Sequence, residues 1–138
     1  MDRDLILEIK LPKVPDIEFV AVEGLERMGK HFGIPDEKIG EARVVVTEAI
    51  INALEHTGDV NQYVNVAFTM TQEKLIVLVS DTGKGFNPNE IEEPDIKNKI
   101  SGENKRGWGL KLMKSMSDDL VIESKPTGTK ISIIKKLK

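Results

Sequence analysis

Residues 36–56 read DEKIGEARVVVTEAIINALEH and form the strongest periodic stretch in the chain. Pro35 directly precedes this stretch, at a position where the start of a helix tolerates proline. One helical face is apolar and carries Ile39, Ala42, Val46, Ala49, Ile50 and Ala53. Because Val44, Val45 and Ile51 extend the apolar surface beyond that face, protein must cover the helix on more than one side. The stretch therefore predicts a long central helix.

The flanking segments predict strands and two shorter helices. Residues 5–11 alternate in the pattern of a half-buried strand, and Pro12 ends it. Asp16 is predicted to cap the helix that follows, and Gly33 to end it. The remaining predicted elements are strands at 63–70 and 74–80, a helix at 108–116, and strands at 120–124 and 130–137. Since strands and helices do not strictly alternate, this order favours an α+β sandwich with its helices on one face of the sheet.

Composition narrows the class of protein. The chain has 138 residues, 39% apolar and 31% charged, which suits one domain over residues 1–138. The absence of cysteine excludes thiolate zinc sites and redox pairs. A formal net charge of -3, with acidic and basic side chains interleaved, argues against nucleic-acid binding. No apolar run approaches the roughly 20 residues of a membrane span, and the N-terminus does not resemble a signal peptide, so we expect a cytoplasmic protein.

Two polar residues interrupt the central helix. Glu48 and Asn52 lie one turn apart on the same face, and His56 lies a further turn on. A carboxylate and an amide in this register can bind one ligand together, although each residue on its own is also typical of a solvated helix face. A buried carboxylate is costly without a partner, and the surrounding residues are apolar, so the pattern favours a lined cavity.

A glycine-rich segment follows the strand at 74–80. In Asp81-Thr82-Gly83-Lys84-Gly85-Phe86, the glycines allow the backbone to approach a ligand closely, and the Asp81 carboxylate can accept a hydrogen bond from an exocyclic amine. An ordinary strand-to-loop turn is the alternative, because Asp-x-Gly is common in turns. Residues 81–105 show little periodicity, and an irregular segment of this length is typical of a binding loop or lid.

A third motif opens the predicted helix at 108–116. In Arg106-Gly107-Trp108-Gly109-Leu110, backbone N–H groups at a helix start lie beside an arginine, which is the chemistry of an anion site. Trp108 is equally explained as a core residue. The segment Thr127-Gly128-Thr129 before the last strand is by itself consistent with a simple hairpin turn.

Together these motifs resemble the Bergerat-type ATP-binding fold shared by DNA gyrase, mismatch-repair ATPases and histidine kinases. All four appear in the family's order, between residues 48 and 129. Within that superfamily, residues 106–120 are most similar to the bacterial anti-sigma-factor serine/threonine kinases. The resemblance implies a two-layer α/β sandwich with a mixed, mostly antiparallel sheet, and an ATP lid at about residues 84–107.

The resemblance also implies roles for individual residues. Asn52 would ligate a Mg²⁺ ion that bridges the ATP phosphates, Glu48 would be the general base, and Arg106 would lie near the terminal phosphate. The other roles implied are nucleotide contacts: Asp81 to the adenine amino group with Thr129 assisting through water, Gly83 and Gly85 through a close backbone approach, and Gly107 and Gly109 through N–H groups to phosphate. The family often has glycine directly after the histidine of the first motif, whereas Thr57 follows His56 here, so His56 receives no role.

The implied activity is phosphoryl transfer from ATP. If Glu48 accepts a proton from a serine or threonine hydroxyl, the protein is a kinase, and if Glu48 orients water, it is an ATPase. Because 138 residues leave no room for a transducing domain or a dimerising helical hairpin, we expect phosphorylation of a separate protein.

The resemblance further implies a homodimer that binds a sigma factor as an anti-sigma factor and phosphorylates a STAS-type anti-anti-sigma antagonist. Two alternatives stay open. One is a switch kinase or ATPase that regulates a phosphatase. The other is a non-catalytic interaction module whose lid conformation depends on ATP.

Overall fold

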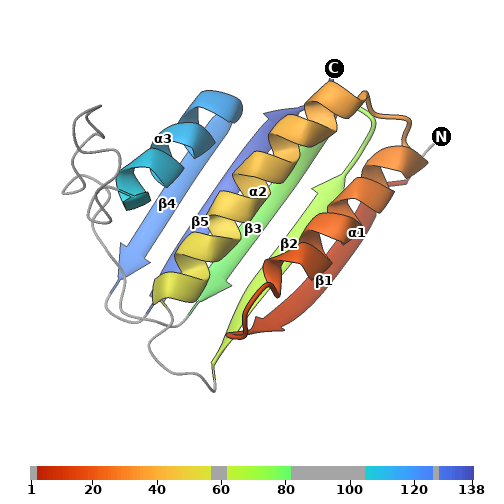
Figure 1. The fold of residues 1–138 in the computed structure, drawn as a ribbon. Coiled ribbons are helices and arrows are strands. Elements are labelled where there is room, and N and C mark those ends of the chain that lie inside the picture. The colour runs from red at the N-terminus through yellow and green to blue at the C-terminus, as the bar shows by residue number, and fades with distance from the viewer. Residues whose placement is uncertain (1–2, 57–61, 82–104, 126–127) are drawn as a thin grey trace.

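The computed structural model describes residues 3–56, 62–81, 105–125 and 128–138, without the side chains of residues 56, 105–108 and 125. Figure 1 shows a sheet with helices packed on one side of it. In chain order the described elements are β1 (Leu5–Pro12), α1 (Glu18–His31), α2 (Asp36–His56), β2 (Tyr63–Met70), β3 (Lys74–Asp81), α3 (Lys105–Met116), β4 (Asp119–Lys125) and β5 (Gly128–Lys136). Every predicted element is present, and the α+β class is confirmed.

The five strands form one sheet in the order β1-β2-β3-β5-β4. All four pairings between these strands are antiparallel. The last strand, β5, therefore lies between β3 and β4, so that the end of β3 meets the start of β5. In this register Asp81 is directly opposite Thr129.

One face of the sheet and the inner faces of the helices form the core. Side chains alternate along each strand between that face and the opposite one, as the period of two requires. The largest buried apolar side chains come from both layers and include Leu25, Ile50, Phe68, Met113 and Ile133. None of the described helices combines the length and the apolar character that a membrane crossing needs.

The prediction of α2 as a central helix is confirmed. Figure 1 shows α1 on one side of α2 and α3 on the other, with β3 and β5 beneath. Accordingly, α2 has buried residues around much of its circumference: Ala42, Val45, Val46, Ala49, Ile50, Asn52 and Ala53. Its second apolar flank is covered because neighbouring helices lie on both sides.

The predicted helix cap at Asp16 is wrong. The residue that precedes α1 is Ile17, and no side-chain hydrogen bond caps the helix. Asp16 has a φ of 64°, in the left-handed region, whereas a capping residue needs extended backbone dihedrals to direct its side chain at the first turn. Asp16 contributes its backbone carbonyl instead, which accepts a hydrogen bond of 3.2 Å from the Phe19 N–H.

Several element ends differ from those predicted. β3 continues to Asp81, and β5 begins at Gly128 rather than at residue 130. Both extensions follow from backbone pairing, since Asp81 pairs with Thr129 and Lys125 pairs with Gly128. A ladder of backbone hydrogen bonds does not depend on side-chain alternation, so it can continue past the point where the apolar pattern stops.

Candidate functional site

Four polar or charged residues in the described part of the chain are buried: Asn52, Asp81, Thr129 and Lys135. The first three were singled out from the sequence. They come from the second half of α2, the end of β3 and the start of β5. Figure 1 shows that these three segments lie at the end of the molecule where α3 begins. Because buried polar groups normally need hydrogen-bond partners, a cluster of them indicates a structural network or a ligand site, and we take this end of the molecule as the candidate site.

Glu48 and Asn52 meet α3 at Gly109. A Cβ atom added to Gly109 would lie 2.7 Å from Glu48 Oε2 and 3.7 Å from Asn52 Nδ2. The shorter distance is closer than a carbon and a carboxylate oxygen can approach without movement. Glycine at position 109 therefore allows the backbone of α3 to come up to both side chains, and the pairing of Glu48 with Asn52 predicted from their spacing is matched by a shared neighbour.

The Asn52 amide has unused hydrogen-bonding capacity. Its residue is only 4% exposed, and Nδ2 has no hydrogen-bond partner among the described residues. An amide nitrogen is a donor suited to a phosphate oxygen, and a half-turn of the amide exchanges nitrogen and oxygen. A buried polar group in this condition costs free energy unless a ligand satisfies it, so Asn52 is suited to contact one.

The donor set around Asn52 fits a magnesium ion that arrives with phosphate. Mg²⁺ commonly takes one or two oxygen ligands from protein and the rest from phosphate and water. The described residues contain no group of three or more His, Cys, Asp and Glu side chains that could hold a metal by themselves. The Asn52 amide oxygen and the adjacent negative charge of Glu48 supply the sparse oxygen environment that such an ion requires.

Asp81 and Thr129 form a cross-strand pair at the core-facing side of the sheet. Both are buried, and their Cα atoms are partners in the antiparallel register of β3 and β5. Asp81 has the same side-chain direction as Leu75, Val77 and Val79, so it continues an apolar stripe with a carboxylate. This adjacency lets the two side chains contact one ligand, and the joint role of Asp81 and Thr129 stays a prediction.

The sequence did not single out Ser124, which also lies at this end of the sheet. Its Oγ is 3.3 Å from Thr129 Oγ1. Ser124 follows the inward-facing Leu120 and Ile122 at intervals of two, which is the signal that could have identified it. Its partner could not be identified in this way, because the pairing of β4 with β5 is set by register.

The remaining predicted site residues are described only in part. Gly83, Gly85 and most of the predicted lid at 84–107 lie outside the described residues. Arg106 and Gly107 belong to the first turn of α3, but the structure describes only their backbone. His56 is the last residue of α2, and its side chain is likewise not described.

Comparison with known proteins gives a matching family model, related serine-protein kinases and solved structures. A family model described as the histidine kinase-like ATPase domain matches residues 18–135. The chain is 27% identical over 129 residues to the serine-protein kinase RsbW of Oceanobacillus iheyensis, covering 86% of this chain and 78% of that protein. It is 28% identical over 145 residues to the serine-protein kinase RsbW of Staphylococcus aureus, covering 99% of this chain and 89% of that protein.

A solved structure has a similar fold. The crystal structure of the RsbU and RsbW domains of a Mycobacterium tuberculosis protein matches with a TM-score of 0.71 and 17% sequence identity. The match covers 96% of this chain and 32% of that chain, so the present sequence spans about a third of the solved protein. At this level of identity, the similarity shows the fold.

Proposed function

The chain belongs to the histidine kinase-like ATPase family, and we propose that it binds ATP and transfers the terminal phosphoryl group to a serine or threonine of another protein. The observation that carries this proposal is the meeting of Glu48, Asn52 and Gly109 at one end of the α2–α3 pair. The names of the relatives from Oceanobacillus iheyensis and Staphylococcus aureus support the serine-protein kinase activity.

In this proposal the sheet binds the adenine. The Asp81 carboxylate accepts a hydrogen bond from the exocyclic amine, and Thr129 assists from the neighbouring strand through water. Gly83 and Gly85 would allow the backbone to lie against the base. Since Asp81 is 7% exposed at the end of an apolar stripe, a flat apolar base with one polar edge is complementary to it.

The phosphates would lie between α2 and the start of α3. Gly107 is in the first turn of α3, where N–H groups have no partner within the helix and the helix dipole favours negative charge. Gly109 contributes by letting α3 approach Asn52 closely, and Arg106 adds positive charge beside the terminal phosphate. A Mg²⁺ ion held by the Asn52 oxygen would supply charge neutralisation on the phosphates.

Glu48 would act on the acceptor. Its carboxylate takes the proton of the incoming serine or threonine hydroxyl, whose oxygen forms the new bond to the γ-phosphorus while the bond to the β-phosphate oxygen breaks and ADP leaves. One turn separates Glu48 from Asn52, so the base and the phosphate ligand lie on the same helix face.

The proposed biological setting is the one that the resemblance to the anti-sigma-factor kinases implies. We propose an anti-sigma factor of the cytoplasm that binds a sigma factor and phosphorylates a STAS-type antagonist, and thereby regulates transcription. Residues 1–138 would act as one domain with a lid at 84–107. A homodimer, which the resemblance implies, is part of this proposal.

The direct test is incubation of the purified protein with labelled ATP, Mg²⁺ and the proteins that co-purify with it or are encoded at neighbouring loci, followed by mapping of the labelled residue. We expect phosphoserine or phosphothreonine in one partner. The Glu48→Gln variant is the matched control and should label none. Partner binding that depends on ATP but yields no phosphorylated product would contradict a kinase.

A further inference from the structure

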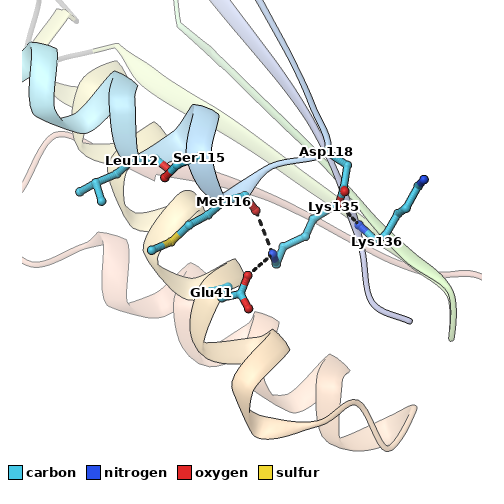
Figure 2. Close-up of polar contacts among 7 residues, drawn as sticks. All are labelled: Glu41, Leu112, Ser115, Met116, Asp118, Lys135 and Lys136. Atoms are coloured by element: carbon cyan, nitrogen blue, oxygen red, sulfur yellow. Dashed lines mark hydrogen bonds and ion pairs between the residues drawn. The ribbon is translucent and has the colours of Figure 1, made fainter. Parts of the chain in front are cut away.

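Lys135 is a buried lysine at the opposite end of the molecule from the candidate site. Its side chain is 4% exposed, and Figure 2 shows its ammonium group between α2 and α3. Lys135 Nζ donates hydrogen bonds to Glu41 Oε2 at 2.9 Å and to the backbone carbonyl of Met116 at 2.8 Å. We name these three residues the Lys135 clamp.

Each contact in the Lys135 clamp has a physical reason. A lysine is almost never fully buried unless it is paired, and Glu41 supplies the opposite charge. Met116 is the last residue of α3, and the last carbonyls of a helix have no partner within it. A positive charge there also complements the negative end of the helix dipole. The Lys135 clamp thus joins the C-terminal end of α3 to both α2 and β5.

The chain segment after α3 is fastened to the same part of β5. The Asp118 N–H donates to the Ile134 carbonyl at 2.9 Å, and the Lys136 N–H donates to Asp118 Oδ2 at 2.6 Å. α3 packs more extensively on α2 than on β4. These bonds therefore fix the end of a helix that the sheet itself supports only slightly.

The Lys135 clamp and the candidate site stand at matched positions along two antiparallel helices. Figure 1 shows α2 and α3 running in opposite directions. Glu41 and Glu48 are seven residues apart on α2, and Gly109 and Met116 are seven residues apart on α3. Seven residues span about two turns and about 10 Å of helix. Fixing Met116 beside Glu41 therefore sets Gly109 beside Glu48.

We propose that Lys135 is a positioning residue for the phosphate end of the site: it sets the position of α3 along α2, and so the approach of Gly109 to Glu48 and Asn52. This inference rests on the proposed function, because it assigns Lys135 a part in binding ATP. Without the Lys135 clamp, α3 can slide along α2 and carry Gly107 and Gly109 away from the phosphates.

The test measures ATP affinity by calorimetry in the full chain with Lys135→Met, which keeps the apolar stem and removes the ammonium group. We expect ATP binding about tenfold weaker than in the parent protein. We also expect the emission of Trp108, the only tryptophan in the sequence and a residue of α3, to change in the absence of ATP.

Two control variants separate positioning from general stability. Lys136→Met changes the neighbouring exposed lysine and leaves its backbone bond to Asp118 intact. Leu137→Ala removes core volume from the same end of the molecule and should lower the melting temperature at least as much as Lys135→Met. Both controls should bind ATP as the parent does and keep the parent emission of Trp108. If Leu137→Ala also weakens ATP binding, and by an amount that matches the fall in its melting temperature, the positioning role of Lys135 is overturned.

The double variant Glu41→Leu/Lys135→Met keeps the test decisive if Lys135→Met alone does not fold. Only Lys135 is buried, since the Glu41 side chain is 32% exposed, so the apolar pair removes the cost of burying the lysine charge, but it cannot donate to the Met116 carbonyl. We expect a folded protein with ATP binding still about tenfold weaker. A double variant that binds ATP like the parent overturns the inference alone, whereas a parent protein that binds no ATP contradicts the proposed function.

Discussion

The two ends of the α2–α3 pair both bury polar groups, but they differ in which groups these are and in what surrounds them. At the clamp end, Lys135 bonds to both Glu41 and Met116. At the candidate-site end, which comprises Glu48, Asn52, Asp81, Gly109 and Thr129, the described residues offer no partner to Asn52 Nδ2. Both ends contain buried polar groups: the Lys135 ammonium is satisfied within the protein, whereas the neighbouring Ser117 Oγ, like Asn52 Nδ2, has no hydrogen-bond partner among the described residues. The Asn52 amide differs in its surroundings, because it lies beside Glu48 and Gly109, and this grouping of residues singled out from the sequence favours a ligand site there.

The largest expected effect falls on the candidate-site end. Glu48→Gln should lower phosphoryl transfer by roughly 10² to 10⁴, the usual contribution of a general base, while ATP affinity stays close to that of the parent. Initial rates with labelled ATP and calorimetric titration measure the two quantities separately. Glu55→Gln, on an exposed position of the same helix, is the control and should retain full activity. Normal transfer by Glu48→Gln would show that Glu48 is not the base.

Asp81→Asn should weaken the binding of ATP. Loss of the charged acceptor is expected to reduce ATP affinity roughly tenfold to a hundredfold, and to reduce the preference for ATP over GTP. Calorimetry with each nucleotide gives both values. Asp119→Asn, an exposed aspartate at the far end of the sheet, should change neither. Equal affinity of parent and Asp81→Asn for ATP would remove adenine recognition from Asp81.

Gly109→Ala and Gly40→Ala compare the two ends with one substitution. A Cβ at position 109 displaces the Glu48 carboxylate, so we expect transfer to fall about tenfold with little change in melting temperature. A Cβ at position 40 meets nothing within 4 Å, so Gly40→Ala should stabilise α2 by about 1 kcal/mol and leave transfer unchanged. Rates and thermal unfolding test both. The reverse pattern would mean that the ends have been assigned wrongly.

The smallest expected effect concerns acid stability at the clamp end. The hydrogen bond from Lys135, followed by its charge, lowers the pKa of Glu41 below its ordinary value of 4.5; Lys38 also lowers this pKa, while burial and Asp118 raise it. A lowered pKa in the folded state means that the ionised carboxylate stabilises the fold above about pH 4.5, and that this contribution is lost as the pH falls through the folded-state pKa.

Thermal unfolding as a function of pH measures this contribution. The melting temperature of Glu41→Gln should lie below that of the parent at neutral pH, and the difference should shrink below about pH 4.5. Glu23→Gln, an exposed position on α1, should follow the parent at every pH. A difference that persists unchanged in acid would mean that the charge of Glu41 does not contribute to stability.

Much of the fold could be predicted because its signals are local. The apolar periodicity of residues 36–56 and the alternation in the strands give the type and order of the elements, and all of these are confirmed. The predicted family is confirmed as well, by a family model that matches residues 18–135. Asp16 shows the limit of such signals, because a residue type that favours helix caps adopted left-handed dihedrals instead.

For the candidate site, too, residue types were predictable from the sequence, whereas contacts between distant residues were not. The motifs identified Glu48, Asn52, Asp81, Gly109 and Thr129 by type and spacing, and their roles in ATP binding and transfer stay predictions. The spacing of these residues along the chain did not show which of them meet across different elements. The pairing of Asp81 with Thr129 depends on the insertion of β5 between β3 and β4, and the contact of Gly109 with Glu48 depends on where α3 lies along α2.

The elements, the apolar faces and the residue types that chemistry requires could be predicted without coordinates, because each of these is set by neighbours within a few positions along the chain. Which distant residues meet depends on how the elements pack against one another. Glu41 and Lys135 are 94 residues apart in sequence and 2.9 Å apart in space. A charge that alternation places on the core side of β5 becomes stable there only when packing brings its partner, and no local pattern specifies that partner.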